Sequence, residues 1–272
     1  MFDLKSFHGV QLPFFALVGP DVIEDSVRPG QTIEFARRLK EICGELGIPF
    51  AFKVSYDKAN RTGLDSFRGP GLEGAMELFR EIRREVGVPL LSDVHRFEEI
   101  EPAAEVLDII QIPAFLSRQT DLLVEVARTG CIVNWKKGQF IAPKDAEHAI
   151  NKMVSTGNEK LIITERGYMF GYNNMVVDMR AFPIMEGFGY PVVMDATHSV
   201  QLPSGGGGKS AGERQFVATL AQAAVAAGAN GCFMETHADP DIALCDGPNM
   251  IPMDEIGTLL KRLKAIHALV RE

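Results

Sequence analysis

Polar and charged side chains follow seven short apolar runs of this sequence, at the point where each run ends. These residues are Lys53 and Ser55, Asp93 and His95, Gln111, Lys136 and Lys137, Glu165 and Arg166, Asp195 and His198, and Glu235 and His237. If the runs are parallel strands, their carboxyl ends meet on one side of the fold, where barrel enzymes place their chemistry. One such residue alone would indicate little, but the repetition predicts a shared functional site.

Basic residues form the larger part of this predicted site. They are Lys53, Lys58, Arg61, Lys136, Lys137 and Arg166, with Arg118 and Lys209 as further candidates. The chain carries 28 lysines and arginines against 36 acidic residues, a net charge of −8. Such a balance argues against a general nucleic-acid binder, which normally carries a basic face. Bases gathered at one mouth of a net-acidic protein instead predict a pocket for a multiply charged anion, such as a phosphate.

A second set combines one imidazole with carboxylates from separate segments: His198, Glu235 and Asp246, with Asp21 after the first apolar run. This combination is typical of a divalent metal site. The spacing leaves alternatives open, because His237 or Asp195 could replace a member and the carboxylates could simply pair with nearby lysines. Cys245 directly precedes Asp246, so contact of its thiol with such a site also stays open.

Apolar runs alternate with amphipathic stretches eight times, which predicts one α/β domain over residues 1–272, a (β/α)8 TIM barrel. The predicted strands are 14–18, 49–54, 89–94, 109–114, 131–136, 160–164, 191–195 and 231–235. The predicted helices are 33–43, 71–86, 97–106, 121–128, 145–155, 176–187, 213–227 and 253–271. A doubly wound open sheet has the same periodicity and remains an alternative. Residues 1–13 are expected to form a short N-terminal β-hairpin extension over the barrel floor.

Several common classes are excluded by composition. No apolar run is long enough to span a membrane, and the first residues lack the pattern of a secretory signal. The four cysteines lie far apart without a CxxC pair, which favours reduced thiols and a cytoplasmic location.

Long motifs spread over the chain closely resemble the family of 3-deoxy-D-manno-octulosonate 8-phosphate synthases, also called 2-dehydro-3-deoxyphosphooctonate aldolases. They are residues 52–61 (FKVSYDKANR), 110–115 (IQIPAF), 118–121 (RQTD), 136–140 (KKGQF), 164–167 (TERG), 170–174 (FGYNN), 195–203 (DATHSVQLP) and 233–237 (FMETH). The resemblance implies a cytoplasmic transferase of lipopolysaccharide precursor biosynthesis. Its substrates would be phosphoenolpyruvate, D-arabinose 5-phosphate and water. Carbon 3 of the enol attacks the aldehyde, water adds at carbon 2, and phosphate leaves by C–O cleavage. No nucleic acid or membrane partner is expected, and family members are typically homotetramers.

The same resemblance implies roles for individual residues. The catalytic residues would be Lys53, Lys58, Asp93, His95, Lys136 and His198. The substrate-binding residues would be Lys53, Ser55, Lys58, Asn60, Arg61, Thr62, Gln111, Arg118, Lys136, Arg166 and Ser210, with Arg118 reaching over from a neighbouring subunit. The metal ligands would be Asp21, His198, Glu235 and Asp246.

Two features keep alternatives open. The sister 3-deoxy-heptulosonate 7-phosphate synthases, which use erythrose 4-phosphate, typically have Lys-Pro-Arg-Thr where this chain has residues 58–61 (KANR). Asp21 stands where the family has cysteine in its metal-requiring class or asparagine in its metal-free class. Three carboxylates beside an anionic substrate resist joint ionisation, which favours a divalent ion (Mn²⁺, Fe²⁺ or Zn²⁺), and an oxygen ligand at Asp21 favours Mn²⁺. A catalytically impaired variant, or a barrel that only binds sugar phosphates, remains the alternative.

Overall fold

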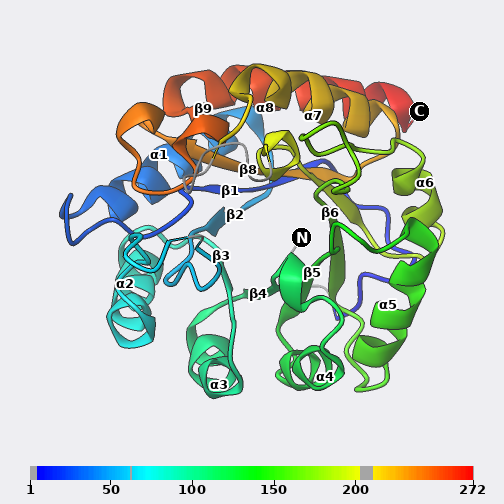
Figure 1. Cartoon of the computed structure of the whole chain (residues 1–272), viewed down its shortest axis with the longest axis horizontal. Helices are drawn as coiled ribbons and strands as arrows, with labels where there is room; N and C mark the ends of the chain where they lie inside the picture. Colours follow the sequence, from blue (N-terminus) through cyan, green and yellow to red (C-terminus); the bar gives the residue numbers. More distant parts are fainter. Residues whose placement is uncertain (1–4, 62, 203–210, 272) are drawn as a thin grey trace.

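Eight parallel strands close into a barrel in the computed structural model, which describes residues 5–61, 63–202 and 211–271 (Figure 1). The strands are β1 (Phe15–Gly19), β2 (Phe50–Lys53), β3 (Leu90–Asp93), β4 (Ile109–Ile112), β5 (Ile132–Lys136), β6 (Leu161–Glu165), β7 (Val192–Asp195) and β8 (Gly231–His237). Each pairs with the next, and β1 also pairs with β8, which closes the ring. The (β/α)8 prediction is therefore confirmed, and the open-sheet alternative is wrong. A short strand, β9 (Ile251–Pro252), is added in parallel to the end of β8.

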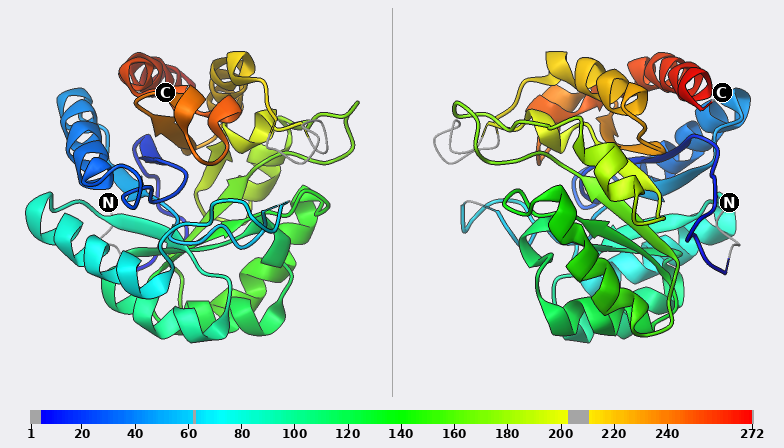
Figure 2. Two further views of the ribbon diagram at one scale, coloured as in Figure 1. Left: turned by 60° about the vertical axis from the view of Figure 1, so that its left-hand side comes forward. Right: turned by 90° about the vertical axis from the view of Figure 1, so that its right-hand side faces the viewer.

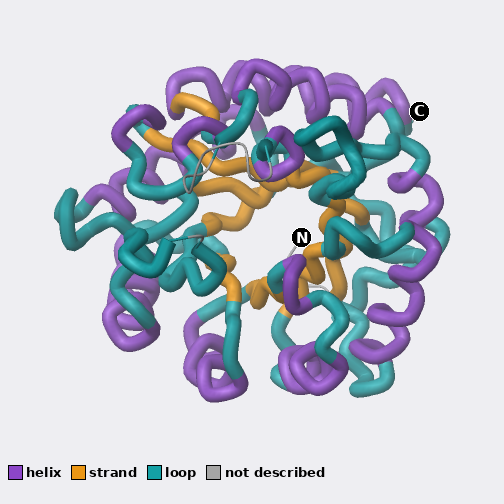
Figure 3. Tube along the Cα trace, in the orientation of Figure 1, coloured by secondary structure: helices purple, strands orange, loops and turns teal. Residues whose placement is uncertain are grey.

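The helices form an outer ring around the strands (Figure 3). They are α1 (Gln31–Leu46), α2 (Leu72–Glu85), α3 (Phe97–Val106), α4 (Thr120–Arg128), α5 (Ala146–Val154), α6 (Ala181–Glu186), α7 (Val217–Ala226) and α8 (Met253–Val270). Each helix turns its apolar stripe toward the barrel, as periodicity predicts. In α1 the buried residues include Ile33, Phe35, Ala36 and Leu39, and the helix ends at Gly47 in the left-handed conformation that favours glycine.

Two predicted helices begin later than expected. Residues 176–180 precede α6 because Val176 and Tyr168 exchange backbone hydrogen bonds in an antiparallel bridge. The segment before α7 forms a 3₁₀ turn over Arg214–Phe216 instead of α-helix. No helix within the described ranges is long and apolar enough to cross a membrane.

The predicted N-terminal hairpin is wrong for residues 5–13, the described part of that segment. Ser6 forms an isolated parallel bridge with Glu159, and the Gly9 amide donates to the Gly189 carbonyl. Both partners lie just before strands, at the amino-terminal end of the barrel. Phe7 is fully buried there, so the segment covers the barrel floor by packing rather than by pairing with itself.

The loops after β2 and β6 extend from the opposite end of the barrel, away from this N-terminal segment (Figure 2). Strand register aligns the polar residues at this end: Asp93 is opposite Gln111, Lys136 opposite Thr164, and Gly19 opposite Glu235. Gly19 must lack a side chain, because a Cβ there would lie 2.0 Å from the Lys53 carbonyl oxygen. The parallel strands thus bring the predicted residues to one mouth.

Candidate active site

A pocket of about 300 Å³ opens at the carboxyl ends of the strands. Twelve of the predicted site residues line it: Lys53, Ser55, Lys58, Asn60, Arg61, Asp93, His95, Gln111, Lys136, Arg166, His198 and Asp246. Asp21 and Glu235 lie directly beneath the pocket and are fully buried. The convergence that parallel strands predict is therefore present, although it does not by itself assign a role to any residue.

Two of the predicted residues, Lys137 and Arg118, do not line this pocket, and three others lie outside the described residues. Lys137 is fully buried and points away from the pocket; its ammonium donates to the carbonyls of Gly138 and Ile141 and lies 3.4 Å from Glu165 Oε2. The prediction that Lys137 belongs to the cationic set is wrong, because side chains alternate between the two faces of a strand. Arg118 is exposed and does not line the pocket of its own chain. Thr62 and Ser210 lie outside the described residues, as does Lys209.

Three buried bases form the floor and wall of the pocket. Lys53, Lys136 and Arg166 are each at most 5% exposed. Lys53 Nζ lies 3.2 Å from Glu235 Oε1 and donates to Ser55 Oγ at 3.0 Å. Burial lowers the pKa of Lys136 and of Arg166 from their usual values, because a buried cation loses its hydration. Such bases gain by meeting a negatively charged ligand.

Asp195 holds two pocket residues together, and its supporting role is missed by the sequence reasoning. Its carboxylate forms an ion pair with Lys136, with Nζ 2.6 Å from Oδ2, and lies 2.9 Å from His198 Nδ1. Burial alone would raise the pKa of Asp195, but His198 and Lys136 outweigh it and the pKa is lowered. The i, i+3 spacing of Asp195 and His198 is the sequence signal that could have indicated this contact.

The predicted metal ligands surround one point beneath the pocket. One ligand atom each from Asp21, His198 and Glu235 lies within 4.8 Å of the others. His198 Nε2 lies 3.6 Å from Glu235 Oε2 and 3.8 Å from Asp246 Oδ2. His198 Nδ1 lies 3.0 Å from Asp195 Oδ1 while Nε2 faces the other carboxylates, which is the arrangement of a metal-binding histidine with a supporting carboxylate.

The charges of this acidic cluster are not balanced by hydrogen bonds. Both carboxylate oxygens of Asp21 and Oε2 of Glu235 are buried without a hydrogen-bond partner among the described residues. Burial and the neighbouring Asp21 raise the pKa of Glu235; at Asp21, Lys58 and Lys53 outweigh burial and lower the pKa. Lys58 pairs with Asp21 Oδ1. Buried carboxylates that lack hydrogen bonds fit a divalent cation, which prefers such oxygen and nitrogen donors.

His95 lies between two carboxylates at another part of the wall. Its Nε2 is 3.0 Å from Asp93 Oδ2, and its Nδ1 is 3.7 Å from Glu99 Oε2. Burial alone would lower the pKa of His95, but Asp93 and Glu99 raise it to about 9. Glu99 itself is held by the Tyr56 hydroxyl and the His95 amide, at 2.9 and 2.7 Å. His95 is therefore protonated at neutral pH.

Gln201 links the two halves of the pocket and was also missed as a structural element. Its side-chain oxygen accepts from Arg166 at 2.5 Å, and its nitrogen donates to Asp246 Oδ2 at 2.9 Å. A glutamine three residues after His198 carries no recognisable signal by itself. The contact depends on how the loop after β7 folds back over the mouth.

The fold and this mouth define a (β/α)8 barrel of the enzyme type, with a pocket lined by basic residues above a cluster of carboxylates and a histidine. The chain belongs to the DAHP synthetase I family, whose model matches residues 2–272. It is 57% identical over 263 residues to a protein of Geobacter metallireducens named 2-dehydro-3-deoxyphosphooctonate aldolase, covering 97% of this chain and 96% of that protein. Proteins of the same name from Geotalea uraniireducens and Geobacter sulfurreducens are 56% and 55% identical, with the same coverage. The resemblance read from the motifs is confirmed.

Proposed function

We propose that this protein condenses phosphoenolpyruvate with D-arabinose 5-phosphate and water, giving 3-deoxy-D-manno-octulosonate 8-phosphate and phosphate. The observation that carries the proposal is the convergence of Lys53, Lys136 and Arg166 in one pocket, next to the more open Lys58 and Arg61. These substrates bring two phosphates and a carboxylate, which need several fixed cations. The names of the relatives support the same reaction.

The buried bases are assigned to phosphoenolpyruvate. Lys53, Lys136 and Arg166 bind its phosphate and carboxylate, with Gln111 beside them. They orient the enol so that carbon 3 faces the aldehyde, and they stabilise the charge that shifts to the leaving phosphate. Lys53 and Lys136 end buried strands and Arg166 directly follows one, so the barrel fixes their backbone positions before substrate binds.

The more exposed side of the pocket is assigned to the sugar phosphate. Asn60 and Arg61 both line the pocket on the loop after β2, and we expect Thr62 to extend this set. Asp93 is held ionised, because His95, Lys53 and Lys58 outweigh the effect of burial and keep its pKa well below the usual value. We assign Asp93 to accept a proton from the attacking water, and protonated His95 to support the developing charge on the acceptor.

Asp21, His198, Glu235 and Asp246 are proposed to hold a divalent ion. Both buried oxygens of Asp21 and Oε2 of Glu235, which lack a hydrogen-bond partner among the described residues, support this assignment. A bound divalent ion supplies Lewis-acid polarisation of the acceptor carbonyl. Lys58 pairs with Asp21, so a divalent ion bound by Asp21 would free Lys58 to bind substrate.

The proposed assembly is a homotetramer in the cytoplasm. Arg118 is exposed on the loop after β4 and does not line the pocket of its own chain. That position suits a side chain that reaches the sugar phosphate of a neighbouring subunit. Removing it by Arg118→Ala should then raise the KM for the aldose phosphate while the metal content stays unchanged. A mixture of Arg118→Ala and Lys136→Met subunits should regain activity if the arginine acts across the interface.

The test of the reaction is phosphate release from phosphoenolpyruvate with arabinose 5-phosphate, with erythrose 4-phosphate, or without an aldose. We expect release with arabinose 5-phosphate above the other two, and loss of activity in chelator with recovery on adding Mn²⁺, Fe²⁺ or Zn²⁺. Preference for erythrose 4-phosphate would assign the chain to the heptulosonate synthases. Binding of both substrates without release would favour an impaired barrel. Full activity in chelator, with metal analysis showing none bound, would remove the metal centre but keep the reaction.

A further inference from the structure

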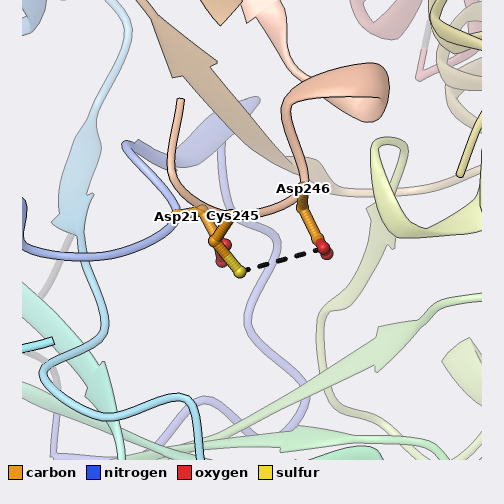
Figure 4. A group of neighbouring side chains, drawn as sticks. All are labelled: Asp21, Cys245 and Asp246. Carbon is orange, nitrogen blue, oxygen red and sulfur yellow. Dashed lines mark hydrogen bonds between the residues drawn. The ribbon is translucent and has the colours of Figure 1, made fainter. Parts of the chain in front are cut away.

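The thiol of Cys245 lies in the acidic cluster beneath the pocket. Cys245 is 4% exposed on the loop between β8 and β9, and its Sγ lies 3.9 Å from Asp246 Oδ1. One ligand atom each from Asp21, Cys245 and Asp246 lies within 4.8 Å of the other two (Figure 4). The same Asp21 also belongs to the group with His198 and Glu235, so the two groups share a residue.

The backbone conformation of this loop directs Cys245 and Asp246 toward the acidic cluster. Asp246 has φ 48° and ψ 18°, the left-handed region that residues other than glycine rarely adopt. The following residue, Gly247, has no room for a side chain, because a Cβ there would lie 2.2 Å from the Pro240 carbonyl oxygen. A conformation that costs free energy and is held by its surroundings is often found at functional sites.

The charged groups around Cys245 suit a sulfur atom that binds a metal cation. Arg61 donates from Nη1 to Cys245 Sγ, and the same Nη1 lies 3.8 Å from Asp246 Oδ1. Both oxygens of Asp21, which is fully buried, lack a hydrogen-bond partner within the part of the chain that the structure describes. A coordinated thiol loses its proton, because the ion is the largest local charge.

We infer that Cys245 supplies a sulfur ligand to the divalent ion of this cluster, next to Asp21 and Asp246. On coordination, the thiol proton leaves to solvent and a metal–sulfur bond forms. The inference builds on the proposed metal centre and changes its chemistry. The soft donor comes from the loop after β8, while the position after β1 carries a carboxylate. A thiolate favours Zn²⁺ or another soft ion over Mn²⁺, in contrast to the preference predicted from Asp21 alone.

The experiment is metal titration of the whole chain followed by ultraviolet absorption. Purified protein is stripped with chelator and titrated with Co²⁺ and, separately, with Cd²⁺. We expect a sulfur-to-metal charge-transfer band that saturates at one ion per chain. Cys245→Ser should lose this band, whereas Asp21→Asn should keep it and need more metal to reach it. Cys131→Ser is the matched control and should keep the band. Cys131 is partly buried and contacts the carbonyls of Ala104 and Leu107, far from the acidic cluster in sequence and fold.

Several results would overturn the inference. They are binding of Co²⁺ or Cd²⁺ to the unaltered chain without a sulfur band, no binding of either ion, or a band that persists in Cys245→Ser. The first two results are measured on the unaltered chain, so they refute the inference even if Cys245→Ser does not fold. Cys245→Ala provides a second variant for the third result. Phosphate release with arabinose 5-phosphate is measured in parallel on the unaltered chain. Activity without a sulfur band would refute Cys245 as a metal ligand and leave the proposed reaction intact. A sulfur band without activity would support Cys245 as a ligand and refute the proposed reaction.

Discussion

Asp195 offers the sharpest test of how this site is held together. It is fully buried and contacts both Lys136 and His198. Lys136 is proposed to bind phosphoenolpyruvate, and His198 is proposed to bind the divalent ion. Asp195→Asn keeps the shape of the side chain and an acceptor oxygen but removes the charge. Two effects should follow: the buried lysine loses its counter-ion, and the His198 ring loses the group that fixes its Nδ1–H.

The magnitudes follow from the burial of these contacts. Removing one partner of a buried ion pair typically costs 3–5 kcal/mol, and because the amide retains a hydrogen bond we expect about 3 kcal/mol. For a chain of this size that corresponds to a fall in Tm of roughly 6 to 12 °C. Loss of a carboxylate behind a metal-binding histidine typically weakens metal affinity about 10- to 100-fold. Both changes should appear in one variant.

Thermal unfolding in chelator measures the first effect, and competition with a metal-binding dye measures the second. Asp178→Asn is the matched control, because Asp178 pairs with the exposed Arg180, at 2.9 Å, on the surface loop before α6. Its Tm and metal affinity should be unchanged, since exposed ion pairs contribute little. If Asp195→Asn has a Tm within two or three degrees of the unaltered chain and binds metal equally well, the assigned role of Asp195 is refuted.

Three further predictions concern other parts of the barrel. Because the pKa of His95 is raised to about 9 from 6.5, its contribution to stability is complete below pH 6.5 and is lost as the pH rises through 9. Glu99→Gln should shrink this loss, measured as urea-unfolding free energies on either side of that window; an unchanged difference would contradict it. Lys136→Met should lower kcat by about 100-fold or more, measured by phosphate release, and a loss below tenfold would be too small for its proposed role. Gly19→Ala should destabilise by about 1–3 kcal/mol, because its Cβ meets the backbone of β2. Gly44→Ala, in open space on α1, should instead stabilise by about 0.5–1 kcal/mol; equal effects of the two would exclude the proposed clash.

The barrel could be predicted because each of its repeating units carries a local signal. Buried parallel strands read as continuous apolar runs, and the helices between them keep one apolar face. The departures arise where distant residues pair. Val176 pairs with Tyr168 instead of beginning a helix, and Ser6 pairs with Glu159 instead of folding back on its own segment. The local sequence around one member of such a pair does not identify the other member.

The site was predictable to the level of strand ends but not of side-chain direction. Lys136 and Lys137 are adjacent basic residues, and the sequence predicts both at the mouth. Successive side chains point to opposite faces, so only one of the two can enter the pocket. Lys136 contacts Asp195 inside the barrel, while Lys137 lies over the Tyr168 ring at 3.9 Å. Knowing which of the two faces inward requires the register of β5 in the closed barrel.

The charge balance of the mouth links the metal centre to substrate binding. Lys53 pairs with Glu235, Lys58 with Asp21, and Lys136 with Asp195, so each of these bases already has a carboxylate partner before any substrate arrives. An incoming phosphate must compete with those carboxylates. The divalent ion proposed at Asp21 and Glu235 would remove that competition by attracting two of the three carboxylates, and such coupling acts equally in both directions. Chelation should therefore raise the KM for phosphoenolpyruvate as well as lower turnover, because the same bases serve the empty cluster and the substrate in turn.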